Sequence, residues 1–169
     1  MKIAQVIGSC GPGGAEIFVK NLSKELKQAG HEVEVWVLSG TADVAGDGEF
    51  LKFKQSYVKD LEESDVKVCF AGKKPRKDWQ KTKAALRAFF RNFKPDIVYS
   101  HLENVAFHTS RSIAGEVPIV QTIHSVVISY PYVQKFYLSE KLTASVAISK
   151  KIYSIISEIL GPRARIYTI

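Results

Sequence analysis

The stretch Ile3-Ala4-Gln5-Val6-Ile7, followed by Gly11-Pro12-Gly13-Gly14-Ala15-Glu16, decides the fold of this chain. The first segment is an apolar run that predicts a buried strand, and the second is a glycine-rich turn. A helical pattern follows at once, with its apolar residues on one face: Phe18, Val19, Leu22 and Leu26. A strand, a glycine turn and a helix in this order place free backbone N–H groups where an anionic ligand can meet them. The loop therefore predicts a site for a phosphate-bearing ligand.

Strand and helix patterns alternate through the rest of the chain. We expect strands at Lys2–Ile7, His31–Leu38, Val66–Phe70, Pro95–His101, Val117–Ile123, Ala144–Ile148 and Arg165–Ile169. We expect helices at Gly14–Ala29, Phe50–Leu61, Trp79–Phe93, Asn104–Ala114, Val133–Leu138 and Ile152–Ile159. Repeated strand–helix units predict a mainly parallel sheet with helices on both faces, joined by right-handed crossovers. The predicted fold is a doubly wound, Rossmann-like α/β domain that spans residues 1–169.

Composition fits one globular domain. The chain has 169 residues, of which 46% are hydrophobic and 24% charged, and this length can bury one substantial core. The sequence has no predicted membrane-spanning segment or signal peptide. The two cysteines, Cys10 and Cys69, lie far apart and predict neither a disulfide framework nor a zinc site. We therefore expect a cytoplasmic protein, in which Cys10 is a small residue at a strand end rather than a nucleophile.

The positive charge is concentrated in one segment. Nine Lys or Arg and one Asp lie between Lys73 and Lys94, so this segment carries +8 of a chain whose net charge is +7. Such a distribution predicts a local basic patch and argues against a nucleic-acid-binding surface.

The basic segment contains the clearest amphipathic helix of the chain. One predicted face carries Trp79, Leu86, Phe89, Phe90 and Phe93. The aromatic residues are expected to pack on the sheet while the cationic face is solvated. Four flanking cations are an alternative site for anionic lipid headgroups at the inner face of a membrane: Lys73, Lys74, Arg76 and Lys77.

Polar or glycine-rich positions follow four of the predicted strands. They are the loop containing Gly13, Gly14 and Glu16, then His101, then His124, then Ser149 with Lys150. The carboxyl ends of parallel strands meet at one edge of the sheet, where ligands bind in such folds. Each position also has a structural alternative. The glycines would serve tight strand-to-helix packing, and His101 and His124 would each be a hydrogen-bonded structural residue. Glu16 would complement a helix dipole, and Ser149 would cap the next helix.

Several phosphate-binding and catalytic motifs are missing from the sequence. It has no GxxxxGK[ST], no clean GxGxxG and no GxSxG. The second predicted strand ends in Leu38-Ser39, without an acidic residue to hold a ribose. Dinucleotide binding is therefore disfavoured.

Four motifs in order resemble retaining glycosyltransferases of family 4, which have the two-domain GT-B fold. They lie at Gly13–Glu16, where the match continues to Val33, at Pro95–His101, at Val117–His124 and at Ala147–Lys150. The resemblance implies that Gly13 and Gly14 approach the donor diphosphate and that His124 lies against the reacting sugar. It also implies that His101 and Ser149 line the cleft between the two domains.

The same resemblance implies that this chain is the N-terminal, acceptor-side domain of a nucleotide-sugar-dependent glycosyltransferase. The family's second domain, with its paired glutamates, is not present, so we expect these residues alone to be inactive. The implied partners are a nucleotide-diphosphate sugar as co-substrate and a glycan, lipopolysaccharide or lipid-linked acceptor, with no cofactor and no metal. The alternative is a non-catalytic Rossmann-like domain that binds a phosphorylated or carbohydrate ligand, or a partner protein.

Overall fold

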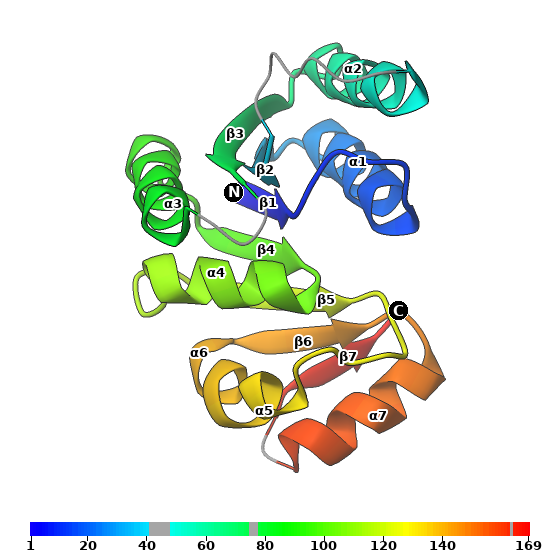
Figure 1. Cartoon of the computed structure of the whole chain (residues 1–169), viewed down its shortest axis with the longest axis vertical. Coiled ribbons are helices and arrows are strands. Elements are labelled where there is room, and N and C mark those ends of the chain that lie inside the picture. Colours follow the sequence, from blue (N-terminus) through cyan, green and yellow to red (C-terminus); the bar gives the residue numbers. More distant parts are fainter. Residues whose placement is uncertain (41–47, 75–77, 163) are drawn as a thin grey trace.

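The computed structural model describes residues 1–40, 48–74, 78–162 and 164–169 of the chain (Figure 1). The strands are β1 (Lys2–Ile7), β2 (Glu32–Ser39), β3 (Lys67–Lys73), β4 (Ile97–His101), β5 (Ile119–Ile123), β6 (Ala144–Ala147) and β7 (Ile166–Thr168). The helices are α1 (Gly14–Gln28), α2 (Gly48–Glu62), α3 (Trp79–Phe93), α4 (Glu103–Ile113), α5 (Pro131–Val133), the π-helical η1 (Gln134–Leu138), α6 (Ser139–Lys141) and α7 (Lys150–Leu160). The alternating order predicted from the sequence is confirmed.

The described strands form one seven-stranded sheet in the order β3-β2-β1-β4-β5-β6-β7. Each neighbouring pair is parallel. The strand order reverses between β1 and β4, because β1 leads to β2 on one side while β4 pairs with its other side. Such a switch point opens a crevice outside the carboxyl ends of the two strands. The fold is the predicted doubly wound, Rossmann-like α/β domain.

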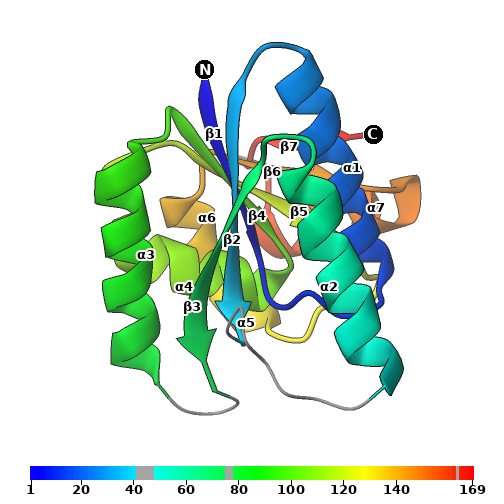
Figure 2. The same ribbon diagram turned by 90° about the horizontal axis from the view of Figure 1, so that it is seen from above.

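Helices cover both faces of the sheet, as Figure 2 shows, with α1 and α2 on one side and α3 and α4 on the other. Strand alternation explains this arrangement, since successive side chains point to opposite faces. On β2, Val33, Val35 and Val37 pack with α1 and α2. Trp36 and Leu38 point the other way and pack with α3 and α4. The two cores therefore share one sheet as their common wall.

The region between β5 and β6 is more helical than the sequence predicted. A single short helix was expected at Val133–Leu138, whereas α5, η1 and α6 run together over residues 131–141. The π-helical turn lies in the middle of this segment. Its buried Gln134 exchanges hydrogen bonds with Gln121 of β5, at 2.9 and 3.3 Å. This partner lies in another element, β5, which explains why periodicity alone missed the irregular turn.

Helix α3 has the predicted bounds and most of the predicted packing. Phe89 and Phe93 pack on Trp36, with ring centroids 5.8 and 6.5 Å apart, and Phe90 joins the same core. Trp79, at the first residue of α3, does not pack on the sheet as expected. Its side chain is 48% exposed and stacks on His108 of α4 instead.

Part of the predicted basic patch, Arg76 and Lys77, falls outside the described residues. Within the described ranges, none of the helices is both long enough and apolar enough to cross a bilayer.

Candidate functional site

The sequence-predicted site residues follow β1, β4, β5 and β6 at the same edge of the sheet. The register places His101 opposite Thr122 and Ile123 opposite Ala147. His101, His124 and Ser149 therefore lie at the carboxyl ends of three neighbouring strands. The glycine loop follows β1, which pairs with β4, so it borders the same crevice.

A chain of hydrogen bonds joins the two histidines to the sheet interior. Nε2 of His101 lies 2.6 Å from Oε1 of Gln5, and its Nδ1 lies 3.3 Å from Nε2 of His124. Because a carboxamide oxygen only accepts, His101 donates from Nε2 and accepts at Nδ1. His124 then donates from Nε2 and keeps an acceptor lone pair at Nδ1. These two hydrogen bonds thus fix the tautomer of His124.

Burial keeps both rings neutral. It lowers the pKa of His101 to about 3, with a smaller contribution from the neighbouring His124. Burial also lowers the pKa of His124, which is half-buried. A neutral His124 near pH 7 presents a lone pair at Nδ1, so it can accept a hydrogen bond or a proton from a hydroxyl group.

His101 does not line the crevice as the resemblance implied but matches its structural alternative, a hydrogen-bonded residue at the strand end. Its side chain is fully buried, beneath His124 and against Tyr99, with ring centroids 4.7 Å apart. It therefore supports His124 and is not placed to contact a ligand directly. Sequence reasoning located the strand end but not the depth of the ring, which depends on packing from α1.

Phe18 connects the first helix to both histidines. Its ring lies 5.7 Å from the centroid of His101 and 5.3 Å from that of His124, edge-on to the latter. Such edge contacts favour one ring orientation. The glycine turn therefore positions His124 indirectly, because it starts the helix that carries Phe18.

The glycine loop is occupied by the side chain of Glu16. The Glu16 carboxylate folds back so closely over Gly13 that a Cβ at this position would clash with it, and Ser9 Oγ lies 3.3 Å from Glu16 Oε1. Gly13 has an extended backbone that any residue can adopt, and the neighbour that a Cβ would meet is the flexible end of the Glu16 side chain, which could move aside. A Cβ at Gly14 would meet no heavy atom of the described residues within 4 Å. The open approach to the N-terminus of α1 is therefore at Gly14, while Glu16 complements the helix dipole.

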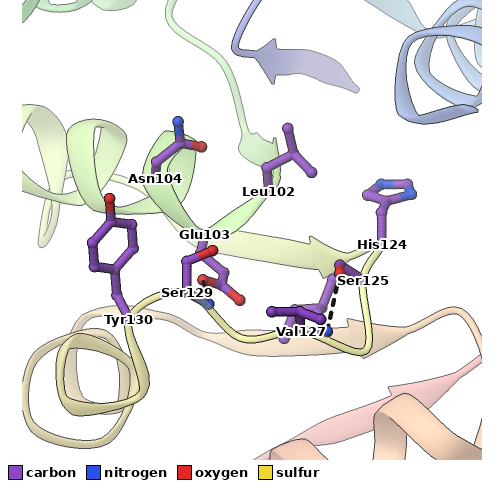
Figure 3. Close-up of a pocket in the computed structure, with 9 residues that line it drawn as sticks. Leu102, Glu103, Asn104, His124, Ser125, Val127, Ser129 and Tyr130 are labelled. Carbon is purple, nitrogen blue, oxygen red and sulfur yellow. Dashed lines mark hydrogen bonds between the residues drawn. The ribbon is translucent and has the colours of Figure 1, made fainter. Parts of the chain in front are cut away.

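A cavity of about 350 Å³ lies beside His124, between the start of α4 and the loop before α5 (Figure 3). Glu103 of this wall accepts a hydrogen bond from the Ser129 backbone N–H at 3.1 Å. Burial raises the pKa of the Glu103 carboxyl, although hydrogen bonds from the Ser129 and Tyr130 backbone partly oppose this. The contact ties the loop to α4 and shapes the cavity.

Leu102 marks the same wall with an unusual backbone. Its φ of 79° and ψ of 149° lie outside the regions that a leucine ordinarily adopts. Backbone strain of this kind costs about 1–3 kcal/mol and is concentrated at functional sites. Sequence reasoning missed Leu102, Glu103 and Asn104, although their position directly after His101 was an available signal.

A match to a protein-family model decides the family. The model of glycosyltransferase family 4 matches residues 12–169, which is nearly the whole chain. The chain belongs to glycosyltransferase family 4.

Solved structures share the fold of this family 4 chain. Sucrose-phosphate synthase from Thermosynechococcus elongatus superposes with a TM-score of 0.74 at 14% identity, over 100% of this chain and 47% of that one. MurG from Acinetobacter baumannii gives 0.66 at 12% identity, over 99% and 45%. The lipopolysaccharide outer core galactosyltransferase WaaB gives 0.65 at 16%, over 98% and 44%. The chain thus spans about half the length of these neighbours, and none of the curated proteins searched matches it.

The remaining site predictions for this family 4 chain have different outcomes. Ser149 is the N-cap of α7, and its Oγ accepts a hydrogen bond from Ile152 N–H at 3.3 Å. Lys150 is exposed in the first turn of the same helix. Burial raises the pKa of Cys10 to about 12, so this residue is a thiol and its alternative role as a nucleophile is not supported. Among the described residues, His, Cys, Asp and Glu do not gather in any group of three that could hold a metal ion.

One buried charged residue near the glycine loop was not revealed by the sequence. Lys54 of α2 is 5% exposed, and its Nζ lies 4.8 Å from the ring centroid of Phe70. Its charge lowers the pKa of Cys10, which opposes part of the effect of burial on that thiol.

Proposed function

We propose that this chain is the acceptor-side half of a retaining glycosyltransferase that uses a nucleotide-diphosphate sugar. The observation that carries the proposal is His124, a neutral, half-buried histidine held by His101 and Gln5 at the edge of the crevice. Membership of family 4 supplies the reaction class. The WaaB and MurG structures share the fold.

In this proposal the donor sugar lies between Gly14 and His124. The N-terminus of α1 stabilises the charge that develops on the leaving diphosphate, since its N–H groups and its dipole point toward it. The acceptor enters the cavity beside His124 and presents a hydroxyl group as the nucleophile. Glu103 and Asn104 of the cavity wall would accept hydrogen bonds from its other hydroxyl groups.

His124 has one of two roles in the transfer. Its Nδ1 lone pair accepts a hydrogen bond from a sugar hydroxyl, which orients the reacting ring, or it receives the proton of the attacking hydroxyl. Both roles require a neutral imidazole in the tautomer that His101 imposes. A nucleotide-binding second domain is needed to exclude water and to enclose the donor.

The alternative is a non-catalytic domain that binds a phosphorylated or carbohydrate ligand, or a partner protein. The glycine loop and the cavity beside His124 would serve that function equally well. A cytoplasmic location and a peripheral contact of the basic segment with anionic lipid also belong to the proposal. Vesicle co-sedimentation tests that contact, and no binding to anionic vesicles at low salt would exclude it.

The decisive experiment is sugar transfer by the longest natural protein that contains these residues. It is incubated with radiolabelled nucleotide-diphosphate sugars and glycan or lipid-linked acceptors, and the anomeric configuration of the product is determined by NMR. We expect transfer with retention of configuration, and no transfer by residues 1–169 alone. Binding of a sugar or nucleotide ligand without any transfer by the longer protein would favour the binding domain instead.

A further inference from the structure

A second cavity of about 290 Å³ adjoins the one beside His124. The surface that faces it is mostly apolar, although polar residues contribute to it, and comes from α3, α4 and the helical segment after β5. The residues are Trp79, Glu103, Asn104, Phe107, His108, Tyr130, Val133, Gln134 and Leu138. We refer to it as the aromatic cavity. No role has been assigned to it so far.

A cluster of stacked rings builds the outer wall of the aromatic cavity. Trp79 stacks on His108 with centroids 4.1 Å apart, and its ring meets Phe107 nearly at right angles at 6.4 Å. Lys73 Nζ lies 5.4 Å from the centroid of Trp79, so the indole is fixed from more than one side. Preformed ring packing of this kind keeps the wall in place without a ligand.

The inner wall carries polar atoms that are already paired. Gln134 exchanges hydrogen bonds with Gln121, which also donates to Ser145 Oγ at 2.9 Å. Leu138 beside it is fully buried. Burial, together with the charges of Lys73 and Arg111, lowers the pKa of His108 to about 4, so its ring is neutral. Apart from Glu103 at its junction with the first cavity, the aromatic cavity therefore offers a largely apolar surface.

The two cavities meet at the start of α4. Glu103, Asn104 and Tyr130 line both of them, and Figure 3 shows these side chains between α4 and the loop before α5. Asn104 and Tyr130 are exposed, at 56% for Tyr130. Each cavity alone is at the lower limit for a ligand pocket. A ligand that filled both would pass across these shared residues.

We propose that the aromatic cavity is a subsite for the apolar part of the acceptor, an alkyl or prenyl chain whose attached sugar lies beside His124. This inference rests on the proposed function, which places the acceptor sugar in the first cavity. Beyond the shared residues Glu103 and Asn104, a sugar ring in the aromatic cavity would bury hydroxyl groups without partners, because the Gln134 amide is already bonded to Gln121, and such burial is costly. A hydrocarbon chain loses no hydrogen bonds there and removes its own surface from water. The acceptor class is therefore a glycolipid or a lipid-linked glycan rather than a free sugar.

The chain has two tryptophans, which provide a probe and an internal reference. Trp79 lies in the aromatic cavity, whereas Trp36 is fully buried in the core and its indole N–H donates to Glu34 at 2.8 Å. The ¹⁵N-labelled 169-residue chain is titrated with octyl β-glucoside below its micelle concentration, and with methyl β-glucoside. We expect a saturable shift of the Trp79 indole signal with the octyl compound, none with the methyl compound, and an unmoved Trp36 signal.

Two variants fill the cavity and one leaves it intact. Val133→Phe adds bulk inside it, and Asn104→Phe adds bulk at its exposed mouth, where folding is not at risk. Each variant should weaken binding of octyl β-glucoside about tenfold or more, because several methylene groups of the octyl tail lose their contacts with the cavity. The control replaces Tyr132 and Phe136 by alanine. These two rings stack on one another in the exposed part of the same helical segment, with Tyr132 77% and Phe136 65% exposed.

The possible results separate this inference from the proposed function. The subsite is refuted if octyl β-glucoside leaves the Trp79 signal unmoved. A shift that never saturates, or that only the Tyr132 and Phe136 control abolishes, would mean adsorption to the surface and would also refute it. Neither result bears on transfer to a polar acceptor. Conversely, an absence of any transfer by the longer protein would refute the proposed function while octyl binding persisted.

Discussion

Two histidine centres in this chain are buried to a similar degree but are held in different ways. His101 on β4 uses both ring nitrogens in hydrogen bonds, to Gln5 and to His124. His108 on α4 is held by stacking on Trp79. Burial lowers the pKa of both, to about 3 and about 4. Both rings are neutral near pH 7, so their protonation does not distinguish them.

The difference lies in what each arrangement can do. Hydrogen bonds fix the tautomer and direction of a ring, and in the first centre they lead outward to His124. Stacking fixes only the plane of a ring and produces an apolar wall. The first centre is therefore suited to orient a reacting group, and the second to bind hydrocarbon.

Acid should produce the largest effect on stability. A histidine with a depressed folded pKa binds a proton more readily when unfolded, so stability is lost as the pH falls below the unfolded value of about 6.5. For His101 we expect a loss of about 2–3 kcal/mol between pH 6.5 and 4.5. Urea unfolding measures it, as the difference between the wild type and His101→Gln.

The two centres should differ at the acid end of that range. The loss of folding stability caused by protonation of His108 should be complete near pH 4, and it should be missing in His108→Gln. The corresponding loss for His101 should continue toward pH 3, and it should be missing in His101→Gln. A pH dependence that is the same in His101→Gln and in the wild type would show that His101 is not buried as described.

Breaking the hydrogen-bonded chain at its inner end should cost less. Gln5→Leu leaves the Nε2–H of His101 unpaired in the core, which costs about 1–3 kcal/mol. Gln5 Nε2 itself has no partner among the described residues, and its removal offsets part of this cost. We expect a net loss near the lower end, measured by urea unfolding. Gln28→Leu on the exposed end of α1 is the matched control. An equal effect of both variants would contradict the hydrogen bond between Gln5 and His101.

Removing the stacking partner should have a smaller effect on stability. Trp79→Leu loses a ring pair worth about 0.5–1.5 kcal/mol. It also exposes His108, so the pKa of His108 should rise toward its ordinary value while that of His101 stays low. NMR titration of the ring protons tests this, and an unchanged pKa of His108 would show that Trp79 does not bury it.

The smallest effect should come from the third position at the sheet edge. Ser149→Ala removes the N-cap of α7 and should cost about 0.5–1 kcal/mol in thermal unfolding. It should leave the titration of His101 and His124 unchanged, because Ser149 is bonded to Ile152 and not to either ring. A shifted His124 titration would place Ser149 in the same network.

Strand ends could be predicted from the sequence, and side-chain depth could not. Buried parallel strands are short apolar runs, and their ends are visible wherever a polar residue such as His124 follows. Trp79 was expected to pack on the sheet and stacks on His108 of α4 instead, because periodicity gives the face of a helix but not the element that this face meets. Glu103 and the π-helical turn at Gln134 depend on partners in other elements, Ser129 and Gln121, which no local pattern contains.

Kinetics of the longest natural protein that contains these residues would test whether the sheet-edge centre carries the reaction. His124→Ala should lower the turnover number for sugar transfer about 100-fold or more, with little change in KM for the donor. His31→Ala, at the start of β2 and away from the crevice, should transfer at the wild-type rate. Transfer by His124→Ala within twofold of the wild type would contradict a role for His124 in the reaction.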